Sequence, residues 1–264
     1  MRSKILNIKN QKNKSKIVCL TAYSKTIAKI LDKYCDIILV GDSLGNVLYG
    51  MENTHNVTLD TMINHGISVK KGIKKSLLVI DMPKNTYNNL LKAKKNAKKI
   101  MSATKCDAIK IESNKKNYSI INNLVKSKIP VMGHIGYTPQ YKKRFKVEGY
   151  TKYEELKLIN EARKIEKAGA FSIVLECIAG ETSKKITKIL KIPTIGIGSS
   201  KNCDGQILVT DDMLGISGFY PKFVKKYVSL DRIIANAVKK YSREVRLKIF
   251  PSGKNTLNGR KYWK

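Results

Sequence analysis

Short apolar runs recur along the chain, and most are followed by a stretch in which apolar residues recur with helical period. Each run is rich in β-branched and other apolar residues and ends at Gly or at a polar residue, as buried strands do. Eight such runs occur: Ile17 to Leu20, Ile37 to Val40, Leu77 to Ile80, Ala108 to Ile111, Val131 to Met132, Ser172 to Leu175, Thr194 to Ile197 and Ile207 to Val209. Because the runs are apolar on both faces, they suit a parallel sheet covered by helices.

The segments between the runs predict amphipathic helices. Leu90, Ala93, Ala97 and Ile100 recur at steps of three and four residues, while lysines fill the opposite face. Thr151 to Ala168 repeats this design, with acidic residues in its first turns and basic residues near its end, as the helix dipole favours. Strands and helices therefore alternate along the chain.

Eight strand and helix units in 264 residues predict a (β/α)8 TIM barrel. A doubly wound open sheet is the alternative, but the last runs are closely spaced and no GxGxxG follows the first run. No linker rich in Pro, Gly or Ser divides the chain. We therefore expect a single domain over residues 1–264, with an N-terminal extension at 1–16 and a basic C-terminal tail at 254–264.

Charge is the unusual feature of the composition. The chain has 52 Lys+Arg against 20 Asp+Glu, a net charge of +32, which suggests an anionic partner such as nucleic acid or a membrane surface. The lysines, however, fall mainly on the expected outer faces of helices, and no nucleic-acid-binding motif is present. We expect a solvated lysine coat and no specific nucleic-acid partner.

Cysteine usage and hydropathy indicate the compartment. The five cysteines are spread along the chain without a CxxC pair or zinc-ligand spacing, which is typical of a reducing cytoplasm. No apolar run reaches the roughly 18 residues that span a bilayer. The basic segment from Met1 to Lys16 lacks the hydrophobic core of a secretory signal. We expect a cytoplasmic protein with no membrane partner.

Acidic residues gather where the expected strands end, which is the rim that carries TIM-barrel active sites. Asp42, Asp81, Glu112 and Glu176 all fall at this rim. Carboxylates so gathered raise one another's pKa unless a cation neutralises them. Oxygen ligands without a Cys or His cluster favour Mg²⁺. For any single acid, capping of the next helix or pairing with a lysine is the alternative.

Lys110 and Glu112 lie two residues apart on one expected strand, so both side chains point toward the barrel interior. Lys110 can bind an anionic substrate, or it can form a Schiff base as in class I aldolases. The second role needs a lowered pKa, which adjacent carboxylates oppose, so we favour binding. His134, in a glycine-flanked segment, is either a substrate hydrogen-bond donor or a core histidine.

Six motifs that occur in a fixed order carry a specific family resemblance. They are VGDSLG at Val40 to Gly45, KIE at Lys110 to Glu112, GHIGYTPQ at Gly133 to Gln140, LEC at Leu175 to Cys177, IGIG at Ile195 to Gly198 and DGQILV at Asp204 to Val209. Together they resemble the ketopantoate (3-methyl-2-oxobutanoate) hydroxymethyltransferase family of the pantothenate pathway. The resemblance extends from about Ile17 to the segment Pro221 to Val224.

The resemblance implies a hydroxymethyl transfer from 5,10-methylenetetrahydrofolate to 3-methyl-2-oxobutanoate, giving 2-dehydropantoate through a Mg²⁺-stabilised enolate. It also implies a cytoplasmic homo-oligomer, a decamer, with small-molecule substrates. Glu176 would be the general base, and Glu112 would complete a Mg²⁺ site directly or through a water. The implied metal ligands are Asp42, Asp81 and Glu112. The implied substrate-binding residues are Asp42, Ser43, Asp81, Lys110 and His134.

Several positions depart from the family pattern. The segment from Tyr141 to Gly149 is shorter than the family's loop and lacks its Gly-Gly pair, Lys84 replaces an aromatic residue, and Asp211 replaces a histidine. His55-Asn56 stands where a Leu-Pro pair is common. The alternative function is a related Mg²⁺-dependent 2-oxo acid lyase, like isocitrate lyase or phosphoenolpyruvate mutase, or an aldolase.

Overall fold

The computed structural model describes residues 2–113, 117–142, 145–218 and 220–257. Contacts between residues divide the chain into two compact units, Met1–Thr210 and Asp211–Lys264. The expected single domain stays a prediction.

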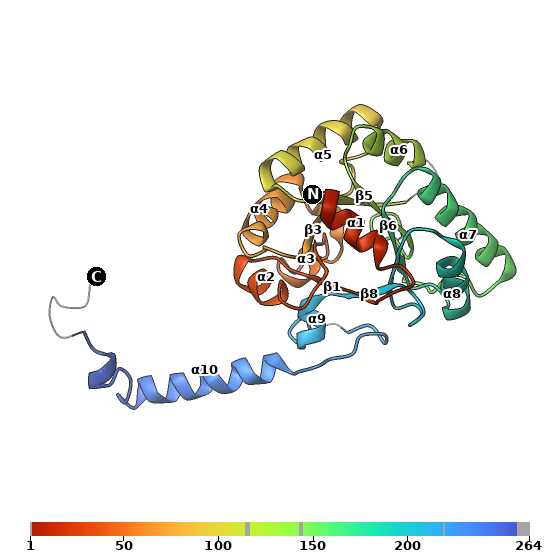
Figure 1. Cartoon of the computed structure of the whole chain (residues 1–264). Helices are drawn as coiled ribbons and strands as arrows, with labels where there is room; N and C mark the ends of the chain where they lie inside the picture. Colours follow the sequence, from red (N-terminus) through yellow and green to blue (C-terminus); the bar gives the residue numbers. More distant parts are fainter. Residues whose placement is uncertain (1, 114–116, 143–144, 219, 258–264) are drawn as a thin grey trace. The chain divides into compact units, whose positions relative to one another are not determined.

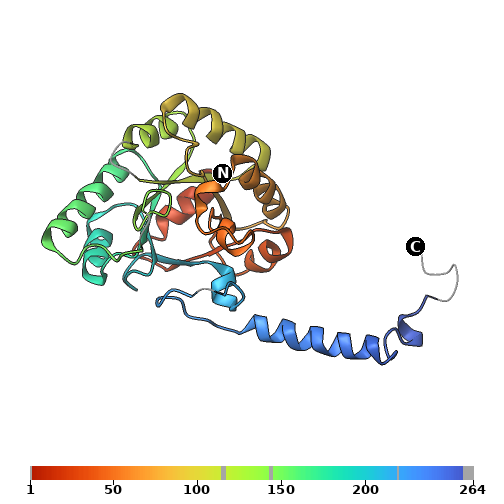
Figure 2. The same cartoon turned by 180° about the vertical axis from the view of Figure 1, so that it is seen from behind.

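The first unit is a closed barrel of eight parallel strands that follow one another in chain order. The strands are β1 (Ile17–Thr21), β2 (Ile37–Val40), β3 (Leu77–Asp81), β4 (Ala108–Glu112), β5 (Val131–Gly136), β6 (Ser172–Glu176), β7 (Thr194–Ile197) and β8 (Gly205–Leu208). Helices surround the barrel in both views (Figures 1 and 2). The predicted TIM-barrel fold is confirmed.

The helices of this unit connect successive strands, apart from the first, which precedes β1. They are α1 (Arg2–Asn10), α2 (Lys25–Leu31), α3 (Leu44–Val47), α4 (Leu59–Lys70), α5 (Leu90–Thr104), α6 (Tyr118–Lys126), α7 (Lys152–Lys167) and α8 (Gly180–Ile189), with a short 3-10 turn η1 (Thr54–Asn56). Because helices follow most of the strands, α4, α5, α6 and α7 pack back onto the sheet and cover its outer face. No helix is described between β7 and β8.

Alternation along the strands separates two layers of apolar side chains. Along β4, Ala108 joins the cluster inside the barrel, whereas Ile109 and Ile111 join the cluster between the sheet and the helices. The two-residue period therefore turns Lys110 and Glu112 inward, as the sequence predicts. Both side chains are buried at the end of the barrel where the strands finish.

Helix ends follow simple capping chemistry. α7 begins after Thr151, whose hydroxyl accepts from the backbone N–H of Glu154 while the Glu154 side chain accepts from Thr151 in return, a capping box. α5 buries Ala93, Ala97 and Ile100 as expected, but Leu90 at its first position is 42% exposed. Leu90, in the first turn of α5, therefore contributes less to the buried apolar face than the periodicity predicts.

The expected N-terminal extension contains a helix that contributes to the barrel core. Ile8 of α1 is 3% exposed and packs in the inner cluster with the first residues of several strands, such as Ile17 and Leu77. Lys12, just after α1, pairs with Asp204 at 2.8 Å. This segment therefore closes the barrel end at which the strands begin, and α1 crosses that opening in Figure 1.

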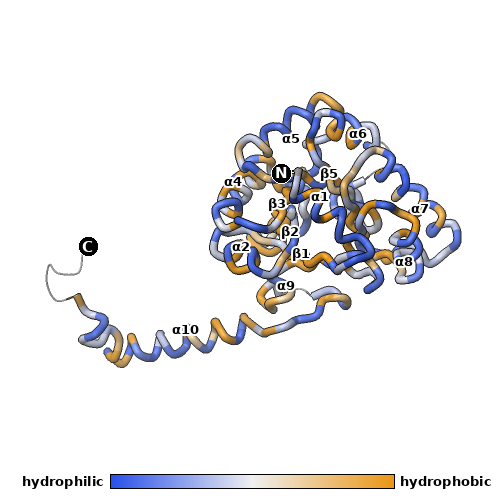
Figure 3. The backbone as a smooth tube through the Cα atoms, viewed as in Figure 1, coloured by the Kyte–Doolittle hydropathy of each residue, from blue (hydrophilic) through white to orange (hydrophobic). Residues whose placement is uncertain are grey.

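The second unit contains α10 (Leu230–Arg246), a helix with no buried residue, together with η2 (Gly253–Asn255) and most of α9 (Thr210–Leu214). Apolar and polar residues alternate along α10 with helical period (Figure 3). Its exposed apolar side chains are Ile233, Ile234, Val238, Tyr241 and Val245. Across the described ranges, no helix combines the length and the apolar character needed to cross a membrane.

Candidate active site

Strand register brings the predicted site residues together where the strands end. Asp81 on β3 is paired with Lys110 on β4, and Glu112 on β4 is paired with His134 on β5. Asp42 follows directly after β2, and Glu176 is the last residue of β6. In-register parallel strands end at one rim, so acids at corresponding strand ends converge there. The structure therefore gathers the residues that the sequence singled out; their roles stay predictions.

Asp42, Asp81 and Lys110 form one buried polar cluster. The backbone N–H of Asp42 donates to Asp81 Oδ2 at 3.1 Å, and Lys110 Nζ lies 2.9 Å from Asp81 Oδ1. Burial raises the pKa of Asp81, although the Lys110 ammonium opposes this. Burial alone would lower the pKa of Lys110, but Asp81, Asp42 and Glu112 outweigh it and raise that pKa. A protonated Lys110 suits anion binding and opposes the Schiff-base alternative.

His134 lies between two carboxylates. Its Nε2 is 3.1 Å from Glu176 Oε2, and its Nδ1 is 3.7 Å from Glu112 Oε1. Burial, reinforced by the Lys110 charge, lowers the pKa of His134 well below its ordinary value, so the ring is neutral at pH 7. Burial raises the pKa of Glu176 to about 7, even though Lys110 opposes the shift. Glu176 therefore has the proton affinity expected of a general base near neutral pH.

Ser43 lies next to this cluster, in the turn that enters α3. Its hydroxyl is hydrogen-bonded to the buried Tyr23 hydroxyl at 2.9 Å. Tyr23 lies just beyond the end of β1 at the same rim, and sequence reasoning gave it no role. The hydroxyl contact orients Ser43, which the family resemblance assigns to substrate binding.

Two further buried residues contact the acids and were not assigned from sequence. Gln140 donates from its backbone N–H to Glu112 Oε2 at 3.0 Å and from its side-chain Nε2 to Asp42 Oδ2 at 2.8 Å. Tyr87 in turn donates its hydroxyl hydrogen to Gln140 Oε1. Gln140 closes the GHIGYTPQ motif, which is a signal for it; the loop that holds Tyr87 carries no such signal.

The departures from the family pattern have different structural outcomes. His55 replaces an apolar residue, and its Nε2 lies 3.0 Å from the Pro139 carbonyl oxygen, so this histidine joins the loop that carries Gln140. The segment from Tyr141 to Gly149 includes residues 143–144, which lie outside the described residues. Within the described part of that segment, Lys142 forms an ion pair with Glu148.

The donor set fits a hard divalent cation. Mg²⁺ is commonly held by one or two carboxylates, with waters and substrate oxygens completing its shell. Asp42 and Asp81 supply two carboxylates that are close enough for the charge of Asp42 to act on Asp81. Among the residues with described positions, no group of three or more His, Cys, Asp and Glu is arranged to hold a metal. Asp42 and Asp81 are therefore two candidate ligands, and waters and substrate oxygens would complete the shell.

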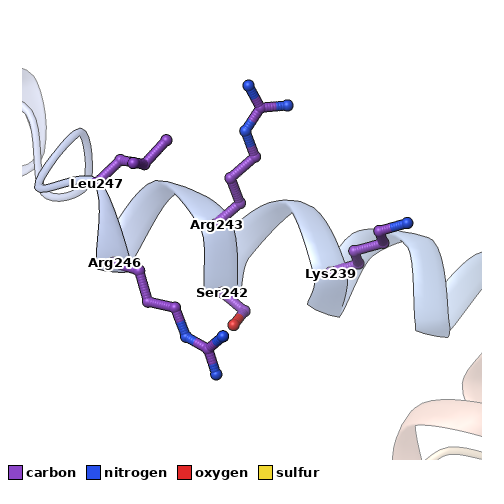
Figure 4. A pocket seen from close by; sticks show the side chains of 5 residues that line it. All are labelled: Lys239, Ser242, Arg243, Arg246 and Leu247. Atoms are coloured by element: carbon purple, nitrogen blue, oxygen red, sulfur yellow. The ribbon is translucent and has the colours of Figure 1, made fainter.

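A separate surface hollow lies on α10 in the second unit, lined by Lys239, Ser242, Arg243, Arg246 and Leu247. Figure 4 shows that these side chains come from one helix and its C-terminal end and that Arg243 and Arg246 point to opposite sides. None of them is a predicted site residue.

Comparison with known proteins supports one family. The sequence profile described as ketopantoate hydroxymethyltransferase matches residues 2–253. A 3-methyl-2-oxobutanoate hydroxymethyltransferase of Pelagibacter ubique is 52% identical, covering 97% of this chain and 100% of that protein. One from Anaplasma marginale (strain Florida) is 48% identical, covering 94% and 90%.

The fold is also similar to a solved structure from a different enzyme group. A 2,3-dimethylmalate lyase, described as a member of the PEP mutase/isocitrate lyase superfamily, superimposes with a TM-score of 0.63. The alignment covers 96% of this chain and 91% of the lyase, at 13% sequence identity. At that identity the likeness shows the shared barrel fold alone.

Proposed function

Because the chain belongs to the ketopantoate hydroxymethyltransferase family, we propose that it transfers a hydroxymethyl group to 3-methyl-2-oxobutanoate, giving 2-dehydropantoate. The one-carbon donor is 5,10-methylenetetrahydrofolate, water supplies the hydroxyl oxygen, and tetrahydrofolate leaves. One observation carries this proposal beyond the family name: Glu176, a half-buried carboxylate whose pKa is raised to about 7 by desolvation, lies at the same rim as a cluster suited to bind a 2-oxo acid.

Glu176 is the general base in this proposal. It removes the proton from C3 of the substrate, and the resulting enolate attacks the methylene carbon of the folate. The neutral His134 ring beside Glu176 avoids placing a second full charge against the carboxylate. The C3–H bond breaks and its proton moves to Glu176, and a C–C bond forms between C3 and the methylene carbon. Both C–N bonds of the methylene bridge break, water adds its oxygen to that carbon, and the C3 proton and one water proton end on the nitrogens of the leaving tetrahydrofolate.

Substrate binding falls to the residues around the base. Lys110 and Ser43 hold the carboxylate of the 2-oxo acid, because a protonated ammonium and an oriented hydroxyl are donors that match it. Tyr23 keeps the Ser43 hydroxyl in place through its 2.9 Å contact. This pairing favours a small anionic substrate.

Asp42 and Asp81 would hold Mg²⁺, with Glu112 joining directly or through a water. When bound, Mg²⁺ supplies Lewis-acid polarisation of the substrate's ketone and offsets the negative charge that develops as C3 is deprotonated. Lys110 contributes positive charge at the same place, on Asp81. Mg²⁺ and the Lys110 ammonium would thus both offset the negative charge of the acids at this rim.

An isotope-exchange assay tests the function. With Mg²⁺ alone in D₂O, the protein should exchange the C3 proton of 3-methyl-2-oxobutanoate, as followed by NMR, and should form product only after methylenetetrahydrofolate is added. EDTA should abolish both processes, and added Mg²⁺ should restore them. Cleavage of a 2-oxo or hydroxy acid without folate would indicate the lyase alternative. Borohydride trapping at Lys110 in the presence of EDTA would indicate an aldolase.

We also propose that the protein works in the cytoplasm as a homo-oligomer, a decamer. All five cysteines are unpaired and buried, which suits a reducing compartment. The exposed apolar face of α10 supports assembly, because an apolar stripe of this kind is stabilised when a protein surface covers it.

A further inference from the structure

Gln140 is the residue that connects the acids of the site to one another. It lies in the loop after β5, is 1% exposed, and uses its backbone N–H and both ends of its side-chain amide in hydrogen bonds. Its backbone N–H reaches Glu112, which ends β4, and its Nε2 reaches Asp42, which follows β2. One residue thus spans two carboxylates from different strands.

The orientation of the Gln140 amide is fixed by its neighbours. Nε2 faces two acceptors, Asp42 Oδ2 at 2.8 Å and the Met82 carbonyl oxygen at 3.0 Å, while Oε1 accepts from the Tyr87 hydroxyl. A flipped amide would place Oε1 against those two acceptor oxygens and Nε2 against the Tyr87 donor. Tyr87, itself 1% exposed, therefore holds the Nε2 donors toward Asp42.

The acids need such a connection because they are buried and like-charged. Asp42 is 5% exposed and Glu112 1% exposed, and after burial itself the nearby Asp42 contributes most to raising the pKa of Glu112. Gln140 brings an N–H to one oxygen of each carboxylate. Its two contacts offset their repulsion and fix the direction in which each carboxylate presents its other oxygen.

We propose that Gln140 is a positioning residue for Asp42, a ligand of the proposed Mg²⁺ site, and for Glu112, which completes that site directly or through a water, and that Tyr87 sets its amide. The inference rests on the proposed Mg²⁺ site. Groups that orient metal ligands by hydrogen bonds commonly contribute to metal affinity without touching the metal. Gln140 matches that position, because it contacts ligand oxygens that the family resemblance assigns to the metal.

Mn²⁺ binding to the full-length protein, measured by electron paramagnetic resonance, tests the proposal independently of turnover. Mn²⁺ is suitable because it takes the same oxygen ligands as Mg²⁺. Gln140→Met keeps much of the volume and removes the side-chain donors, so the Kd for Mn²⁺ should rise roughly 10- to 100-fold. Tyr87→Phe removes one hydroxyl, so the Kd should rise roughly 2- to 10-fold.

Matched controls separate positioning from general destabilisation. Gln206→Met and Tyr153→Phe change the same residue types at exposed positions, and both should bind Mn²⁺ like the wild type. In Gln140→Met, excess Mg²⁺ should restore part of the lost turnover, because the defect lies in metal affinity. A purely structural role would lower the Tm and leave the Kd of the folded fraction unchanged.

The possible results distinguish failure of the Gln140 inference from failure of the proposed metal site. An unchanged Mn²⁺ Kd in folded Gln140→Met overturns the inference while leaving the metal site intact. If that variant does not fold, Tyr87→Phe decides in its place, and an unchanged Kd there overturns the inference. Absence of Mn²⁺ binding in the wild type, or wild-type binding in Asp81→Ala, overturns the proposed metal site and the inference with it.

Discussion

Desolvation raises the proton affinity of the Glu176 carboxylate. An exposed glutamate is ionised at neutral pH but is a weak base, whereas burial raises the pKa of Glu176 to about 7. The proposed base is active only when deprotonated, so the rate should fall as the pH drops below about 7. A neutral His134, 3.1 Å away, leaves this titration to the carboxylate.

Glu176→Gln tests that assignment at the residue scale. The amide keeps the shape but cannot accept the C3 proton, so C3 exchange should fall by about 10²- to 10⁴-fold. Mn²⁺ affinity should stay close to that of the wild type, because Glu176 is not among the proposed ligands. Exchange measured by NMR in D₂O over a range of pH gives both the loss and the pH profile. Retained exchange in the variant would rule out Glu176 as the base.

The candidate residues differ in how well sequence could predict them. Asp81, Glu112 and Glu176 end apolar strands, so their meeting follows from the rule that the ends of parallel barrel strands share one rim. Gln140 and Tyr87 lie in loops after strands, where no period indicates which way a side chain points. Their contacts depend on how loops from different barrel units pack, which a local pattern does not encode.

At the scale of elements, Asp32 connects one helix to the start of another strand. It is the C-cap residue of α2, and its carboxylate accepts from the backbone N–H groups of Lys74, Lys75 and Ser76 just before β3. Burial alone would raise the pKa of Asp32, but these backbone donors outweigh it and hold the pKa below its ordinary value. The loop that enters β3 is thus fixed to α2 by one charged acceptor.

Asp32→Asn should lower the free energy of unfolding by about 1–2 kcal/mol at pH 7, because hydrogen bonds to a charged acceptor are replaced by weaker ones. The folded-state pKa lies below the unfolded value, so the carboxylate stabilises the fold above the unfolded pKa. That contribution is lost as the pH falls through the folded-state pKa. Urea unfolding at pH 7 and at pH 3 measures both values. An equal difference between variant and wild type at the two pH values would contradict this account.

The bounds of helices and strands were predicted well where the apolar periodicity covers the whole element. They were predicted less well where contacts with a neighbouring strand decide where the element begins or ends. β5 was expected over Val131 to Met132 but continues to Gly136, because Gly133 and Gly136 pair with β6 despite their low strand preference. β8 begins at Gly205, two residues before the expected run, because Gly205 pairs with Ile17. The segment from Met1 to Lys16 was predicted to be an extension, but its Ile8 is buried against the first residues of several strands.

For the whole molecule, the order of apolar runs was enough to predict the closed barrel. Helices follow most of the strands and cover the sheet, and the eight parallel strands close on themselves, although no helix is described between β7 and β8. The net charge of +32 comes in part from lysines of helices such as α5, which lie mostly on the outer face. That this charge serves no specific nucleic-acid partner stays a prediction. Local sequence patterns did not predict the second unit, whose helix α10 buries no residue within the described chain.

The proposed homo-oligomer makes α10 the most informative element to alter. Its apolar face is exposed, with Ile234 49% and Val238 58% accessible, and contact with another copy would remove this face from water. Ile234→Asp places a charge on that face and should shift the protein toward smaller species in sedimentation velocity. Asn236→Asp introduces the same residue two positions along, on the polar side of the helix, and should sediment like the wild type. Wild-type sedimentation of Ile234→Asp would show that this face of α10 does not hold the assembly together.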